Sequence, residues 1–186
     1  MTKIKVIEHA DAKGRLKEIY DDLVKQRGKL AEVHKIQSLR PESIVKHMDL
    51  YLEIMFSKSD LSRAQREMMA VVVSATNKCA YCQVHHAEAL INYWKNEEQV
   101  NQLRENFRLL ALTEEDMALC EYAELLTNSV TEVEKAGLVH SLKEKGFSDE
   151  AILDATLVIS YFNFVNRIVL ALGVEYSEEE KTGYNY

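Results

Sequence analysis

Residues 62–90 read SRAQREMMAVVVSATNKCAYCQVHHAEAL and contain two helical patterns separated by one short break. Ser62 and Gln65 have the capping-box pattern that begins a helix, and we expect this helix to continue to about Thr76. Residues 68–75 are apolar almost all round, a composition typical of a helix that is buried on every side. This first helix is therefore predicted to be a central element of the fold.

The rest of the chain has the same helical periodicity. One proline and six glycines leave few turn formers, and no segment alternates apolar and polar residues with hairpin signals at its ends. The sequence therefore predicts an all-α fold of seven or eight helices, with one domain over residues 1–175 and a polar tail over residues 176–186. Besides the helices within 62–90, helices are expected over about Leu16 to Gly28, from Pro41, from Thr113, from Thr131 to Gly146, and from Ser148 to Gly173.

The composition excludes several classes of function. The chain has 186 residues, of which 47% are hydrophobic and 28% charged, and its net charge is −7. An acidic balance argues against nucleic acid or an anionic membrane as the main partner. We find no signal peptide and no run of about 18 apolar residues, so no transmembrane helix is expected. Three cysteines are too few for a secreted disulfide scaffold, and a cytoplasmic location is predicted.

The second helix, over roughly residues 79–93, carries the chemistry. Cys79, Cys82 and His86 occupy positions i, i+3 and i+7, which lie on one stripe of a helix. The two thiols can therefore approach closely enough to bridge. A cysteine in the first turn also lies near the positive end of the helix dipole, which lowers its pKa and favours the reactive thiolate.

A thiol that attacks a peroxide needs a proton acceptor for itself and a proton donor for the departing oxygen. A histidine can do both, and a carboxylate can orient it. Glu67 borders the apolar run of the preceding helix, where a carboxylate needs a partner, so we expect it to lie beside His86. His85 is expected to point about 100° away from His86, at a surface or an interface.

Simpler interpretations stay open for the same residues. Cys79 and Cys82 could be small core residues, or with Glu67 and His86 they could bind zinc. Structural zinc sites usually draw on two separated ligand clusters, and no second cluster is present. Glu67 could also be a solvated residue paired with Arg63.

Other reactive side chains have weaker signals. Cys120 is expected to be a core thiol, and packing or an interface is expected for Asn166 and Arg167. No role is assigned to the four remaining histidines: His9, His34, His47 and His140. A thioredoxin-like protein is disfavoured because its CxxC motif belongs to a βαβ pattern, which is missing.

The spacing of Glu67, Cys79, Cys82 and His86 resembles a known signature. It matches the pattern E-x(11)-C-x-x-C-x-x-x-H of the AhpD-like alkylhydroperoxidases, which belong to the carboxymuconolactone decarboxylase superfamily. The later segments YFNFVNR and ALGV, at 161–167 and 171–174, resemble the peroxidase-related branch of that superfamily. The resemblance covers most of the chain and is firmest between residues 62 and 90.

The resemblance implies a function. Cys82 would attack a hydroperoxide and become a sulfenic acid, and Cys79 would resolve it as a disulfide. His86 would relay the proton with support from Glu67. The chain would then be an antioxidant peroxidase of the peroxiredoxin type. Tyr81 stands where founding members have a histidine, so part of the proton network differs.

The resemblance also implies partners. A dithiol donor, lipoylated or thioredoxin-like, would reduce the disulfide, and the chain would form a homo-oligomer. Neither a metal nor an organic cofactor is expected. Two further functions stay open: a disulfide oxidoreductase or redox sensor of the same superfamily, and a zinc-stabilised helical module. A decarboxylase-like enzyme ranks lower because those relatives typically lack the CxxC motif.

Overall fold

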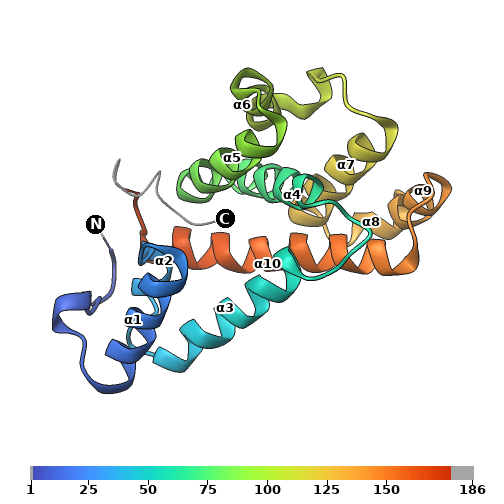
Figure 1. Ribbon diagram of the computed structural model, residues 1–186. Coiled ribbons are helices and arrows are strands. Elements are labelled where there is room, and N and C mark those ends of the chain that lie inside the picture. Colours follow the sequence, from blue (N-terminus) through green and yellow to red (C-terminus); the bar gives the residue numbers. More distant parts are fainter. Residues whose placement is uncertain (1, 177–186) are drawn as a thin grey trace.

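A computed structural model of the protein describes residues 2–176, where ten α-helices and two 3₁₀ helices occur without any β-strand (Figure 1). The all-α prediction is confirmed. Eight of the α-helices have seven residues or more, and two are single turns. The elements are η1 (His9–Asp11), α1 (Gly14–Arg27), α2 (Glu32–Lys35), α3 (Pro41–Phe56), α4 (Arg63–Thr76), α5 (Ala80–Trp94), α6 (Glu97–Asn106), η2 (Phe107–Leu109), α7 (Glu114–Asn128), α8 (Glu132–Lys135), α9 (Leu138–Glu144) and α10 (Asp149–Leu172).

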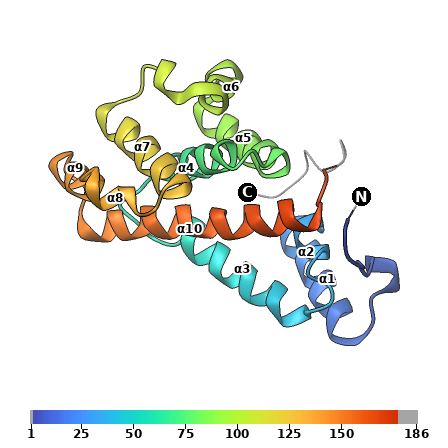
Figure 2. The same cartoon turned by 180° about the vertical axis from the view of Figure 1, so that it is seen from behind.

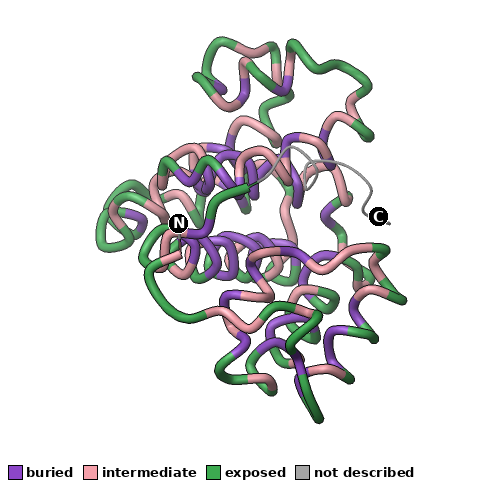
Figure 3. Tube along the Cα trace, turned by 90° about the vertical axis from the view of Figure 1, so that its left-hand side faces the viewer, coloured by how far each residue is buried: buried purple, intermediate pink, exposed green. Residues whose placement is uncertain are grey.

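Helix α4 is the buried centre of the larger core. Its N-cap is Ser62, whose side chain accepts from the Gln65 N–H while the Gln65 side chain accepts from the Ser62 N–H, as the capping box predicted. Every residue from 66 to 74 is buried. Helices α5, α7 and α10 pack against it, and the buried parts of the chain run along these inward faces (Figure 3).

Helices α1 and α3 pack together over a second, smaller core on the other side of α10 (Figures 1 and 2). Leu16, Ile19 and Leu23 of α1 meet Ile44 and Met48 of α3 in this core. Helix α10 contacts both α3 and α4. The space between the two cores is therefore bounded by α1–α3 on one side and by α4, α5 and α10 on the other, and the candidate site lies there.

Two parts of the helix assignment from sequence were wrong. The helix expected from Thr131 to Gly146 is two helices, α8 and α9, because Gly137 adopts a left-handed φ of 65° between them. Helix α6 was not predicted, although Asn96 caps it by accepting from the Gln99 N–H at 3.0 Å. Most of the predicted tail, residues 177–186, lies outside the described residues.

By length and composition alone, helix α10 is apolar and long enough to cross a membrane. No such helix was expected from the sequence. Ten of its residues are buried against the rest of the protein, including the polar Asn166. The same helix contacts α3, α4, α7 and α9. It therefore serves as a core helix of this fold.

Candidate active site

The turn between α4 and α5 sets the position of both cysteines. Lys78 has a left-handed φ of 57°, which reverses the chain directly after α4. Cys79 is then the N-cap of α5, and its N–H donates to the Ser74 carbonyl at 2.9 Å. Cys82 follows in the first turn of α5, near the positive end of the helix dipole.

The two sulfurs form one unit. Both cysteines are free thiols, and their Sγ atoms lie 2.8 Å apart with almost no solvent exposure. The two thiols are hydrogen-bonded to each other, and this bond lowers the pKa of Cys79 although burial opposes it. The same bond, together with burial, raises the pKa of Cys82. The two thiols therefore titrate as one unit. After the first proton leaves, the remaining proton is held between the two sulfurs.

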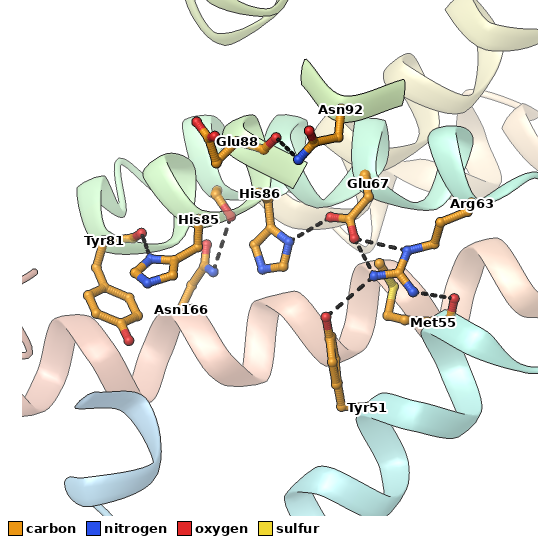
Figure 4. A network of polar contacts seen from close by, with 11 residues as sticks. Tyr51, Met55, Arg63, Glu67, Tyr81, His85, His86, Glu88, Asn92 and Asn166 are labelled. Carbon is orange, nitrogen blue, oxygen red and sulfur yellow. Dashed lines mark hydrogen bonds and ion pairs between the residues drawn. The ribbon is translucent and has the colours of Figure 1, made fainter. Parts of the chain in front are cut away.

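Glu67 joins a histidine and an arginine, as Figure 4 shows. Its Oε2 atom lies 2.7 Å from His86 Nδ1, and its Oε1 atom accepts from Arg63 Nη2 at 2.6 Å and from Arg63 Nε at 3.0 Å. Arg63 also donates to the Met55 carbonyl and to the Tyr51 hydroxyl. Glu67 is fully buried, so it is not the solvated residue of the simpler interpretation, although it does pair with Arg63.

The partners of Glu67 keep it ionised. Burial acts to raise the pKa of Glu67, but the charges and hydrogen bonds of His86 and Arg63 outweigh burial, so this pKa lies below its ordinary value. A carboxylate only accepts hydrogen bonds, so His86 Nδ1 carries a proton toward Glu67. In the neutral imidazole this leaves His86 Nε2 with a lone pair, ready to accept a proton. The edge-to-face contact with Phe162, with ring centroids 4.4 Å apart, also fixes the imidazole.

A cavity of about 90 Å³ brings Cys82, His86 and Glu67 to one wall. Cys79 is not part of its lining but borders a separate hollow of about 460 Å³ beside the end of α10. Cys82 thus lines the first cavity, and Cys79 lines the second. The remaining lining of the cavity comes from α1–α3 and the loop between α1 and α2 (Arg27, Lys29, Ala31, Val33, His34, His47, Met48, Tyr51), from α5 (Tyr81, His85) and from α10 (Tyr161, Phe162, Val165).

Comparison with known proteins shows what the chain is similar to. Residues 43–125 match the model of the carboxymuconolactone decarboxylase family. The chain has the fold of a structure described as an alkylhydroperoxidase AhpD core, an uncharacterized peroxidase-related protein of Ralstonia eutropha JMP134, with 24% identity and a TM-score of 0.84 over 96% of this chain and 93% of that one.

Other known proteins are similar to this chain along most of their length. An uncharacterized peroxidase-related protein of Silicibacter sp. TM1040 is 28% identical, with a TM-score of 0.82 over 96% of each chain. The uncharacterized protein YdfG of Bacillus subtilis (strain 168) is 27% identical over 73% of this chain and 90% of its own length. The debrominase Bmp8 has the same fold, with 20% identity and a TM-score of 0.79 over 96% and 94% of the two chains.

His85 was expected at a surface or an interface. Its side chain is half-buried and lines the same cavity as His86. Figure 4 shows both rings on the side of α5 that faces α10. The reason is local: His85 Nδ1 lies 2.9 Å from the Tyr81 carbonyl, and its ring stacks on Tyr81 with centroids 4.4 Å apart. These contacts turn the imidazole inward.

Tyr81, the residue before Cys82, ties α5 to α2. Its ring is buried, and its hydroxyl accepts from the Val33 N–H at 3.3 Å. Together with its ring contact with His85, this bond makes Tyr81 part of the cavity wall.

Four residues of the cavity lining were not predicted: His34, His47, Tyr51 and Tyr161. His47 is 5% exposed, and its Nε2 atom lies 2.6 Å from the Tyr161 hydroxyl. His34 packs edge-on against His47, and Tyr51 packs against Tyr161. One signal was present: His47 and Tyr51 are four residues apart and therefore share one face of the helix expected from Pro41.

The remaining sequence predictions for reactive residues have simple outcomes. Cys120 is fully buried, as expected of a core thiol. Asn166 is also fully buried and accepts from the Asn77 side chain, so it fastens the α4–α5 turn to α10. Within residues 2–176, no three side chains of His, Cys, Asp or Glu gather in a way that could hold a metal ion. The zinc alternative therefore has no ligand set in the described part of the chain.

Proposed function

We propose that this protein is a thiol-dependent hydroperoxide reductase in which Cys82 attacks the peroxide. One observation carries the proposal. Cys82 lies on a cavity wall shared with His86, whose ring is held by the buried Glu67, while its sulfur lies 2.8 Å from a second thiol. The kinship with proteins described as peroxidase-related supports the same class of reaction.

In the first step, His86 Nε2 accepts the proton of the Cys82 thiol. The thiolate attacks the terminal oxygen of the hydroperoxide, the S–O bond forms and the O–O bond breaks. The electron pair of that bond leaves on the second oxygen, which His86 then protonates. The products are an alcohol and the sulfenic acid of Cys82.

In the second step, Cys79 attacks the sulfur of the sulfenic acid and water leaves. A disulfide bond measures about 2.05 Å, so sulfurs already 2.8 Å apart need to move little to form it. The attacking species is the Cys79 thiolate, and its proton leaves with the hydroxyl of the sulfenic acid as water.

In the third step, an external dithiol reduces the Cys79–Cys82 disulfide. We propose a lipoylated or thioredoxin-like protein as the donor, acting in the cytoplasm. The hollow beside Cys79 supports an approach on the side away from the peroxide cavity, so substrate and donor would use separate faces.

The predicted homo-oligomer also stays a proposal. Helix α10 exposes Leu153, Leu157 and Phe164 at spacings of four and seven residues, which places them on one outward stripe. A second copy of the chain would cover this stripe. Light scattering of the purified protein tests it: a monomer at micromolar concentration would contradict the proposal.

The function is tested by counting free thiols before and after one equivalent of tert-butyl hydroperoxide. In the wild type we expect two of the three thiols to be lost. In Cys120→Ser we expect both remaining thiols to be lost. Adding a dithiol should restore the lost thiols in each case. In Cys82→Ser the loss should be abolished at the same time scale. An unchanged thiol count in the wild type would reject the proposal.

A redox sensor or a disulfide oxidoreductase is the second candidate, because the close pair of thiols serves it equally well. Such a protein would exchange its disulfide with a partner protein without fast peroxide turnover. The debrominase Bmp8 shares this fold, so the fold also occurs in an enzyme described by another activity. Steady-state consumption of hydroperoxide with dithiothreitol separates the two candidates, since a protein that only exchanges its disulfide with a partner would add nothing to the rate of dithiothreitol alone.

A further inference from the structure

The cavity has a second polar wall that the proposed peroxide chemistry has not yet used. Tyr161 of α10 lines the cavity together with Cys82 and His86. This residue is buried, with 5% exposure. Its hydroxyl oxygen lies 2.6 Å from His47 Nε2. The direction of the proton in this bond follows from the neighbours of His47.

Gln37 fixes the tautomer of His47. The Gln37 Nε2 atom lies 2.8 Å from the Val33 carbonyl and 2.8 Å from His47 Nδ1. A carbonyl only accepts, so this end of Gln37 is the NH₂ group, and its second N–H points at His47 Nδ1. His47 Nδ1 must therefore accept, which leaves the proton of the neutral ring on Nε2, facing Tyr161.

His47 stays neutral under ordinary conditions, because burial lowers its pKa to about 4. Its Nε2–H consequently donates to the Tyr161 oxygen, and the proton of the Tyr161 hydroxyl is not used in this bond. The hydroxyl has no other hydrogen-bond partner among residues 2–176. Burial also raises the pKa of Tyr161 well above its ordinary value, so the hydroxyl keeps its proton. A buried donor without an acceptor in the protein points to an acceptor supplied by a ligand.

We propose that the Tyr161 hydroxyl donates a hydrogen bond to the oxygen that leaves when Cys82 attacks a hydroperoxide. This inference rests on the proposed function and deepens it. As the S–O bond forms and the O–O bond breaks, negative charge develops on the leaving oxygen, and Tyr161 stabilises that charge. The proton that completes the alcohol is the one His86 took from Cys82, so Tyr161 ends the step unchanged.

Arg27 adds positive charge to the same cavity. It lines the cavity and lies over the rings of Tyr51 and Phe56, with its Cζ atom 5.5 and 5.8 Å from their centroids. No carboxylate in the described part of the chain pairs with it. An anionic leaving oxygen would thus meet a donor and a cation on the wall opposite Glu67. His47 and Gln37 are positioning residues in this scheme, since they act through Tyr161.

The alternative is that the His47–Tyr161 bond only fastens α3 to α10. Leaving groups separate the two roles, because a donor to the leaving oxygen matters most when the leaving anion is basic. The test measures the oxidation rate of Cys82 by tert-butyl hydroperoxide, which releases an alkoxide, and by peracetic acid, which releases acetate. Alkylation of the same thiol by iodoacetamide needs no stabilised oxygen and reports the thiol alone.

For Tyr161→Phe we expect the rate with tert-butyl hydroperoxide to fall by about 10²-fold, the scale found when one oxyanion donor is removed. The rate with peracetic acid should fall much less, and the alkylation rate should stay as in the wild type. Tyr122→Phe is the matched control: Tyr122 is equally buried, and its hydroxyl bonds Thr156 of α10 at 2.8 Å, but it does not line the cavity. It should leave all three rates unchanged.

Each other outcome is decisive. Equal losses in all three reactions of Tyr161→Phe would mean a structural role and overturn the inference alone. Unchanged peroxide rates in Tyr161→Phe would do the same. A wild type that reacts with iodoacetamide but with neither peroxide would overturn the proposed function together with this inference.

Discussion

Replacing Glu67 with glutamine is the sharpest perturbation of the candidate site, since the shape is kept and only the charge is lost. The carboxylate now serves His86 with one oxygen and Arg63 with the other. In Glu67→Gln one of these positions becomes an NH₂ group that faces another donor. In both orientations the largely buried Arg63 loses its counter-ion, and when the NH₂ group faces His86 the imidazole also loses the acceptor that orients its ring.

The size of the effect on stability follows from burial. Removing one partner of a buried ion pair costs about 3–5 kcal/mol, because the other charge is left uncompensated. The matched control is Glu124→Gln, which breaks the exposed pair with Arg108, and such pairs contribute about 0–1 kcal/mol. Urea unfolding at pH 7 should therefore show a clear loss of unfolding free energy for the first variant and almost none for the second.

The effect on chemistry follows from the loss of the carboxylate that orients the base His86. General-base catalysis contributes about 10²–10⁴-fold, so the rate of Cys82 oxidation by tert-butyl hydroperoxide should fall by that order in Glu67→Gln. Stopped-flow measurement of thiol loss checks this. Oxidation at the wild-type rate, or stability equal to that of Glu124→Gln, would refute the coupling of Glu67 to His86.

The pH dependence has a definite sign. Because the folded-state pKa of Glu67 lies below its ordinary value of 4.5, its stabilisation is present above pH 4.5 and is lost as the pH falls through the folded-state pKa. The difference in unfolding free energy between wild type and Glu67→Gln should therefore be constant near neutrality and shrink in acid. A difference that grows in acid would contradict the ionised state of Glu67.

Three further predictions concern the cavity walls. His47 has a folded-state pKa of about 4 against an ordinary 6.5, so the unfolded chain takes up a proton at a higher pH than the folded chain does. As the pH falls from 6.5 to 4, the unfolding free energy of the wild type, measured in urea, should therefore drop by about 3 kcal/mol relative to that of His47→Gln. Tyr81→Phe leaves the buried Val33 N–H without its acceptor and should lower the unfolding free energy by about 1–3 kcal/mol; a loss within 0.5 kcal/mol would contradict the role of Tyr81 as a tie to α2. Arg27→Met should lower the ratio of the Cys82 alkylation rates with iodoacetate and with iodoacetamide by about fivefold, which corresponds to roughly 1 kcal/mol of attraction between one cation and the anionic reagent. An unchanged ratio would show that Arg27 does not attract anions into the cavity.

The sequence predicted the parts of the protein that depend on local rules. The capping box at Ser62, the break at Asn77-Lys78 and the glycine after α10 are short-range signals, and each appears where expected. The contact of Glu67 with His86 was also predictable, because a buried carboxylate needs a partner and a short turn leaves few choices. The catalytic roles of these residues stay predictions.

The parts that were missed depend on tertiary packing. His34 and His47 carry no motif, and they reach the cavity only because α2 and α3 fold back against α10. His85 was assigned to a surface or an interface on helical geometry alone, but a contact with Tyr81 turns it inward. The single turns α2 and α8 are too short for any periodicity to reveal.

The central claim is that Cys82 is the sulfur that attacks the peroxide. Cys79→Ser removes the resolving thiol, so the sulfenic acid on Cys82 should accumulate with one equivalent of tert-butyl hydroperoxide and be captured there by dimedone in peptide mass spectrometry. Cys82→Ser, in which Cys79 lies off the cavity, should give no adduct on the same time scale. An adduct on Cys79 in Cys82→Ser at the rate seen for Cys82 in Cys79→Ser, or no adduct in either variant, would contradict the account.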